Sequence, residues 1–135
     1  MSLSIIRKAL EQRLAALAPA IATAYENAPF VPAVGTPYQR VSMLPATPDN
    51  STQGATLYLE IGIFQVTLMW PMGVGPSVME DRAQLLRTHF KRGTSMVESG
   101  ITVIVTKTPS VAPAFVDGDR FTVPISIAFQ AQVAT

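Results

Sequence analysis

The closing segment of the chain, residues 120–133 (RFTVPISIAFQAQV), places an apolar residue at every second position. This period is that of a β-strand with one apolar face, because successive side chains of a strand point to opposite sides. Pro124 has no backbone N–H to donate to a neighbouring strand, so the strand is expected to lie at a sheet edge or to be bulged there. Its apolar set is Phe121, Val123, Ile125, Ile127, Phe129, Ala131 and Val133.

The rest of the chain predicts helices and further strands within one domain. Apolar residues at helical spacing predict a helix that begins at about residue 4 and is ended by Pro19, which disfavours helix at Ala18, and a second helix from about Ser77 to Lys91. The fold class is therefore α+β, a mostly antiparallel sheet packed by an N-terminal and a central helix over residues 1–135. The expected strands are 21–26, 38–44, 55–70 (one strand or two, with Gly62 as a bulge), 94–98 paired with 101–107, and the closing strand after a type I′ turn at Asp117–Gly118.

Composition excludes several classes of protein. Hydrophobic residues make up 48% of the chain, which is typical of a folded domain. The net charge is +1 with mixed signs, so no basic surface for nucleic acid is indicated, and the absence of Cys excludes disulfide and thiolate chemistry. No apolar run approaches the about 20 residues of a membrane span, and charges interrupt the N-terminal apolar segment as they would not in a signal peptide. A cytoplasmic protein is expected.

The glycine-rich corner PMGVGP, residues 71–76, raises the question of a phosphate site before the second helix. It matches neither GxGxxG nor a Walker sequence. Ser77 is expected to cap the helix, and the acidic Glu80 and Asp81 favour the helix dipole but would repel a phosphate. The corner is therefore interpreted as a turn.

No catalytic, cofactor-binding or metal-binding residues are predicted. His89 is the single histidine and lies near the end of a helix, where a structural or solvated role is expected. Asp117 and Asp119 flank Gly118, but a short turn offers too few of the about six to eight oxygens that calcium requires. The sequence therefore predicts a protein that is not an enzyme.

The non-apolar faces of the expected strands are polar but almost free of charge. Charged residues make up 14% of the chain, against about 25% in a typical domain. Charge is depleted at the centres of protein interfaces, so we expect this face to meet another subunit, although a solvated Thr-rich sheet remains the alternative. The candidate interface residues are Thr122, Pro124, Ser126 and Gln130 on the closing strand.

The loop 45–56 is longer than a tight hairpin requires and contains small polar residues without an apolar anchor. We expect it to be mobile and to order against a partner in the assembly, with a solvated loop as the equal alternative. Its candidate contact residues are Asp49, Asn50, Ser51, Thr52 and Gln53.

The order of these landmarks resembles a known family. It comprises ENAPFVP (26–32), YQRVSMLPA (38–46), GIFQVTLMWPMGVG (62–75), HFKRG (89–93) and VPISIAFQA (123–131). The pattern is similar to that of the tail terminator proteins of long-tailed bacteriophages and prophages, and it covers nearly the whole chain.

This resemblance implies a structural role without a reaction or a cofactor. Tail terminators form a hexameric ring that caps the tail tube, ends its polymerisation and presents a surface to head-completion proteins. The implied partners are further copies of the chain, the tail tube protein and a head-completion protein, with no membrane and no sequence-specific nucleic acid. The implied location is the virion tail, and the host bacterial cytoplasm during assembly. The alternatives are another head-tail connector or neck completion protein, or a small β-rich ligand-binding domain.

Overall fold

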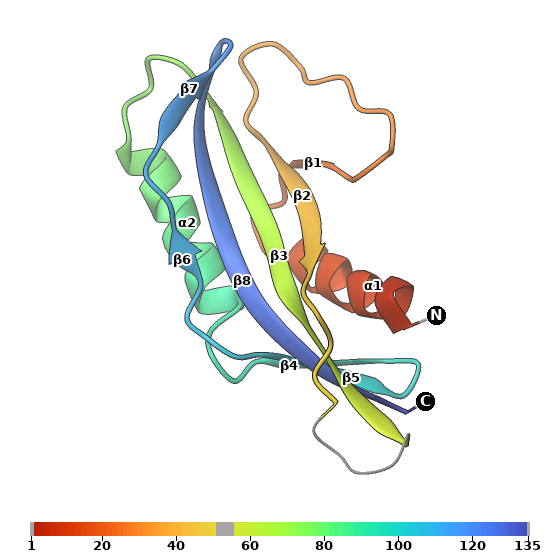
Figure 1. Ribbon diagram of the computed structural model, residues 1–135. Coiled ribbons are helices and arrows are strands. Elements are labelled where there is room, and N and C mark those ends of the chain that lie inside the picture. The colour runs from red at the N-terminus through yellow and green to blue at the C-terminus, as the bar shows by residue number, and fades with distance from the viewer. Residues whose placement is uncertain (1, 51–55, 135) are drawn as a thin grey trace.

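The computed structural model describes residues 2–50 and 56–134, and it confirms the α+β fold class. Helices α1 (Ser2–Ala15) and α2 (Ser77–His89) pack on a strongly curved sheet (Figure 1). Neither helix is long and apolar enough to cross a membrane among the described residues. The strands are β1 (Ala22–Ala24), β2 (Tyr38–Pro45), β3 (Leu57–Pro71), β4 (Ser95–Glu98), β5 (Ile101–Val105), β6 (Ser110–Val111), β7 (Phe115–Asp117) and β8 (Arg120–Ala134).

The sheet is built around one long antiparallel pair. β3 and β8 pair without interruption from Leu57↔Ala134 to Pro71↔Arg120, and the strand order is β1-β2-β3-β8-β5-β4, with β6 and β7 also on β8. β1 pairs with β2 in parallel, the exception in an otherwise antiparallel sheet. Parallel neighbours cannot be joined by a tight hairpin, and the long segment 25–37 supplies the connection that returns the chain to the start of β2.

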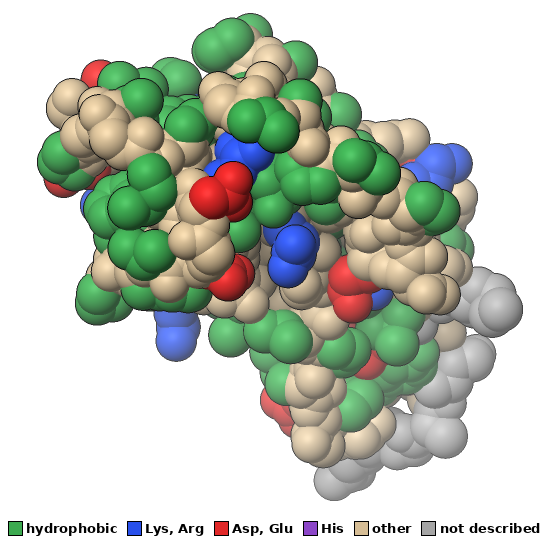
Figure 2. Space-filling model, turned by 90° about the horizontal axis from the view of Figure 1, so that it is seen from above, with side chains coloured by type: hydrophobic (Ala, Val, Ile, Leu, Met, Phe, Trp, Pro, Cys, Tyr) green, Lys and Arg blue, Asp and Glu red, His purple; other side chains and the backbone are tan. Residues whose placement is uncertain are grey.

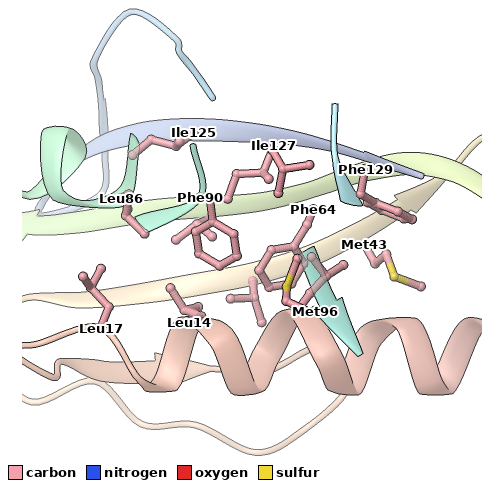
Figure 3. Close-up of a cluster of buried hydrophobic side chains, with 14 of the residues drawn as sticks. Leu14, Leu17, Met43, Phe64, Leu86, Phe90, Met96, Ile125, Ile127 and Phe129 are labelled. Atoms are coloured by element: carbon pink, nitrogen blue, oxygen red, sulfur yellow. The ribbon is translucent and has the colours of Figure 1, made fainter. Parts of the chain in front are cut away.

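The hydrophobic core lies between the helices and one face of the sheet. The alternate residues of β8 point into it as the sequence pattern predicts, and Phe64 and Phe90 are completely buried beside them (Figure 3). Burial of each such large apolar side chain contributes about 1.5–3 kcal/mol. The core therefore fixes which face of β8 turns inward.

β8 is a central strand, so the prediction of a sheet edge was wrong. β3 pairs with one side of β8, while β5, β6 and β7 pair with the other. The Pro124 carbonyl accepts a hydrogen bond from Ala112 N at 3.0 Å, so the backbone of Pro124 faces the side of β6 and β7. Its missing N–H falls just where the β6 pairing ends and before the β7 pairing begins, so the proline lies in a gap between two short ladders.

Gly62 is not a bulge, because its register with both neighbours is continuous. Its role is to let the Phe129 ring and the Leu44 backbone approach the β3 backbone closely. A Cβ at this position would lie 2.8 Å from the Leu44 carbonyl oxygen and 2.9 Å from Cζ of Phe129. Glycine therefore leaves room for the Phe129 ring against the backbone.

Helix ends and one turn also differ from the expectation. α1 ends at Ala15, before Pro19, and tighter turn bonds follow it, such as that from Leu17 N to Leu14 O at 3.1 Å. α2 begins after Pro76 with no side-chain cap, so Ser77 does not cap it. In the β7–β8 turn the central residues are Gly118 and Asp119, and Gly118 alone has positive φ, which fits type II′ rather than type I′.

Candidate functional site: the helix-free sheet face

The sheet face that turns away from both helices is the first candidate for a binding surface. Its central rows run across three strands, with Gln65 of β3 between Ser42 of β2 and Ser126 of β8. The next rows towards the C-terminal end of β8 contain Leu44, Ile63 and Ala128, then Ile61, Gln130 and Ile104. We call this surface the helix-free face.

Charge is nearly absent from the helix-free face. The face is counted here from the row of Arg40, Thr67 and Pro124 to the row of Leu59 and Gln132. Within these rows Arg40 is the one ionisable side chain among the described strand residues. Apolar side chains lie in the open instead, and Val97 of β4 exposes 68% of its surface. A surface that is both apolar and free of acids is typical of the centre of a protein interface. The other exposed apolar side chains of the face are Leu44, Ile63 and Ile104.

Three of the four predicted interface residues lie on the accessible part of this face. Pro124, Ser126 and Gln130 are partly exposed on β8. Thr122 is buried, and its hydroxyl lies 3.5 Å from Sδ of Met69. Met69 packs with Phe30 and Tyr38 of the segment that crosses this end of the sheet, so Thr122 is covered by the chain itself.

The predicted partner loop lies at the opposite end of the β2–β3 hairpin. Asp49 and Leu59 exchange two backbone hydrogen bonds, at 2.9 and 2.8 Å, so strand pairing extends into the predicted loop. Asp49 and Asn50 are exposed. Ser51, Thr52 and Gln53 lie outside the described residues.

A second surface, which the sequence analysis missed, is the end of the molecule where three loops meet. The loop end comprises 25–37, 71–76 and the β7–β8 turn (Figure 1). Buried Arg120 joins two of them by donating to the carbonyl oxygens of Ala33, at 2.8 Å, and Thr36. Its guanidinium also lies 5.0 Å from the ring centroid of Tyr38.

Apolar side chains are prominent at the loop end, as the view from above shows (Figure 2). Val31 and Val34 are 91% and 94% exposed. The PMGVGP corner contributes an apolar pocket of about 300 Å³, whose lining contains no charged residue. Val31 and Val34 beside prolines were the sequence signal for this surface, since an extended segment rich in proline cannot bury them in a helix or strand.

His89, the single histidine, forms a structural contact with Arg13. His89 Nε2 lies 2.5 Å from the Arg13 carbonyl oxygen, and Arg13 Nη2 donates to the His89 carbonyl oxygen at 2.9 Å. These reciprocal contacts join the ends of α1 and α2. No group of three or more His, Asp or Glu residues is placed to hold a metal within the described part of the chain.

Two carboxyl groups around Arg7 have shifted pKa values. A hydrogen bond from Met43 N at 2.6 Å, together with one from Arg7 at 2.8 Å, holds the pKa of Glu26 below its ordinary value. Burial raises the pKa of Glu11, although Arg7 opposes the shift. Arg7 pairs with Glu11 on the same helix and joins Glu26 to that helix, so this cluster has a packing role.

Comparison with known proteins decides the family. The model of the phage tail terminator protein family matches residues 5–129. The chain belongs to the phage tail terminator family. The protein is therefore a structural component of a phage tail, of a family whose members are not normally enzymes.

Two solved structures share the fold of this terminator-family protein. One, of a protein that bears only a sequence label, is 29% identical with a TM-score of 0.77, over 98% of this chain and 97% of that chain. The other belongs to the virion of a native gene transfer agent particle and is 19% identical with a TM-score of 0.63, over 98% and 97% of the two chains. No protein of curated function matches the chain.

Proposed function

We propose that the protein is the subunit of a hexameric ring that caps the tail tube, ends its polymerisation and offers a surface to a head-completion protein. Family membership supports the role in the tail. The likeness in fold to a component of a gene transfer agent virion is consistent with it. The protein acts in the virion tail and assembles in the cytoplasm of the host bacterium.

The observation that carries the ring proposal is the helix-free face. A monomer that left this face in water would expose aliphatic side chains such as Leu44 and Ile104 without any acid beside them. Contact with another copy would bury them without desolvating a carboxylate, and Arg40 at the edge of these rows is the one charge nearby among the described strand residues. Pro124, Ser126 and Gln130 are the proposed contact residues on β8.

The two ends of the molecule would then remain for the partners along the tail axis. The β2–β3 loop, with Asp49 and Asn50 at its described start, is the proposed contact to the tail tube or to the next head-proximal protein. Copies of one loop arranged in a circle bind together, so weak individual contacts add through multivalency. No part of this arrangement requires a cofactor or a sequence-specific contact to nucleic acid.

Electron microscopy of the protein mixed with purified tail tubes tests the proposal. A ring at one tube end, together with an arrest of further tube growth when tube subunits are added, is expected. Binding to the tube end without arrest would identify another connector or neck protein instead. Failure to bind tube ends would contradict the proposal.

A further inference from the structure

The segment 25–37 holds two valine side chains out into solvent at the loop end. Val31 and Val34 are almost completely exposed, although both are aliphatic. Val34 is the second residue of a turn that is closed by a hydrogen bond from Thr36 N to the Ala33 carbonyl oxygen at 3.2 Å. We call Val31 and Val34 the valine knob.

The valine knob is held in place by contacts on both sides of it. Before it, Phe30 packs against Tyr38 with ring centroids 5.1 Å apart, in the small cluster that contains Met69. Beside Val34, Arg120 Nη2 donates to the Ala33 carbonyl oxygen at 2.8 Å. Three prolines in 25–37 restrict the backbone further. The valines are therefore presented in a defined position, which lowers the entropic cost of burying them against a partner.

The corner 71–76 forms a complementary shape on the other flank of the loop end (Figure 1). Its pocket of about 300 Å³ is lined by Phe121 and by residues of the corner, none of them charged. Met72 in its wall and the neighbouring Val74 are half exposed. The pocket has room for two valine side chains, which have three carbon atoms each. We call it the corner pocket.

A ring needs two different contact surfaces on each subunit. Contact of one surface with the same surface of a second copy is two-fold symmetric and closes as a dimer, whereas contact between different surfaces continues from copy to copy. The helix-free face packed only against itself would therefore form no ring. The valine knob and the corner pocket are different surfaces, and they lie on opposite flanks of one end with the β7–β8 turn between them (Figure 1). A head-to-tail contact requires this placement.

The size of the contact indicates what occupies the pocket. The valine knob, with Met72 and Val74, offers on the order of 300 Å² of apolar surface, at about 100 Å² for a whole side chain. A stable interface between separate proteins buries about 1,600 Å² in total, of which a little over half is apolar. The knob and the pocket are too small to hold a separate protein, but they add to a contact between two copies that also meet through a larger surface.

We propose that the valine knob of one copy inserts into the corner pocket of the next copy around the ring. This inference rests on the proposed ring and adds which two surfaces of neighbouring subunits meet. Insertion would bury aliphatic side chains without desolvating a charge, because neither the segment from Asn27 to Pro37 nor the lining of the pocket carries one. The tip of the β7–β8 turn would remain open to a partner along the tail axis.

Cysteine cross-linking tests this contact, because the chain has no cysteine of its own. Val34→Cys and Met72→Cys are made as separate proteins, mixed, added to purified tail tubes and oxidised. We expect a covalent dimer from the mixture and much less from either protein alone, since knob does not meet knob and pocket does not meet pocket. Val34→Cys mixed with Gln84→Cys, on the exposed surface of α2, is the matched control.

Electron microscopy of the same samples separates this inference from the proposed function. Rings on tube ends without a dimer between Val34→Cys and Met72→Cys would overturn the inference and leave the ring. As much dimer in the Gln84→Cys control would do the same. Absence of any assembly, in solution and on tube ends, would overturn both.

Removal of the valine knob gives a second readout that needs no oxidation. Both valines are exposed, so Val31→Ser/Val34→Ser should keep the Tm of the monomer. The protein concentration at which rings form, in solution or on tube ends, should rise about tenfold or more, because two aliphatic side chains no longer leave water. Leu85→Ser removes an exposed aliphatic side chain from α2 and should leave ring formation unchanged. Unchanged ring formation in the double variant would overturn the inference, and loss of tail completion with unchanged rings would assign the knob to an axial partner instead.

Discussion

At the residue scale, polar side chains of this protein join elements that are distant in sequence. Arg13 and His89 hold the ends of α1 and α2 together, and Arg120 holds 25–37 to the sheet. Arg13 donates twice to the His89 carbonyl oxygen, and Arg120 donates to the carbonyl oxygens of Ala33 and Thr36. The side chains of Arg13, His89 and Arg120 therefore serve to hold elements of the fold together.

Replacement of His89 by alanine should leave tail completion intact. The variant loses the contact of the imidazole with the Arg13 carbonyl oxygen but keeps the reverse bond to the His89 backbone. Urea unfolding should show a loss of about 0.5–1.5 kcal/mol. Tail completion that fails in a variant with native fold and oligomeric state would show a functional role for the imidazole.

The pH dependence of stability should differ in sign between Glu26→Gln and Glu11→Gln. The folded pKa of Glu26 lies below 4.5, so ionised Glu26 stabilises the fold above that value, and the stabilisation is lost as pH falls through the folded pKa. The folded pKa of Glu11 is raised, so its contribution is complete below 4.5 and is lost as pH rises through the folded pKa.

Urea unfolding at a series of acidic pH values checks this prediction. Glu26→Gln should flatten the loss of stability on acidification, and Glu11→Gln should steepen it. The same slope in both variants and the wild type would show that neither carboxyl is coupled to folding.

Gly62→Ala should destabilise the fold by about 1–3 kcal/mol, because overpacking displaces neighbours that cannot all yield. The Phe129 ring can move, but the Leu44 carbonyl is backbone. In a double-mutant cycle measured by urea unfolding, Phe129→Leu should relieve part of the cost of Gly62→Ala. If the stability losses of the two single variants simply add in the double variant, the strain of Gly62→Ala does not act on the Phe129 ring.

At the element scale, the pair of β3 and β8 forms the centre of the sheet, and the other strands pair with it directly or through β2 and β5. β3 and β8 are each 15 residues long, and together they pair along their full length. β5, β6 and β7 pair with the edge of β8 that lies opposite to β3. These strands are too short to form a stable sheet alone. The pairing on the β2 side of β3 continues past Pro45 through the Asp49↔Leu59 bridge, which lies within the length of the β3–β8 pair.

Shortening of the β2–β3 loop should separate folding from function. Replacement of residues 51–55 by a two-residue turn retains the Asp49↔Leu59 pair, so the fold and self-association are expected to survive. If the loop contacts the tube or the next protein, completed tails should be lost, because the loss is repeated in every copy of a ring. Tails of normal length that still join heads, counted by electron microscopy, would contradict the role of the loop.

At the scale of the whole molecule, the two faces of the sheet have different surroundings. The helices cover one face with the apolar core, and Arg40 is the one charged side chain in the central rows of the helix-free face among the described strand residues. A subunit with this distribution is suited to side-by-side association with copies of itself, while the loop end and the β2–β3 loop remain at opposite ends (Figure 1).

Lysine at Ser126 and Gln130 should weaken self-association, because a ring would have to bury unpaired ammonium groups. Both side chains are partly exposed, so the monomer is expected to fold, whereas lysine at the buried Thr122 would test only stability. Gln84→Lys, on the exposed surface of α2, is the matched control. Light scattering should show smaller particles for the first variant alone. Unchanged particle size in both would exclude the helix-free face as the interface.

The sequence alone determined the fold class and most elements, because local periodicity carries that information. The alternation from Phe121 to Val133 predicted both the strand and its inward face. The expected pairing of 94–98 with 101–107 was also found, and both residues of the turn between them, Ser99 and Gly100, have positive φ. The resemblance of the ordered motifs also identified the family that the comparison confirmed. The polar, uncharged face was recognised from the same alternation.

Only the tertiary structure decided where these elements lie relative to one another. The central position of β8, the parallel pairing of β1 and the burial of Thr122 depend on partners that lie far away in the sequence. The same holds for Arg82, which a helix pattern would place among ordinary surface charges and which the fold buries beside Gln39. Periodicity tells which residues of an element share a face, but long-range packing decides what covers that face.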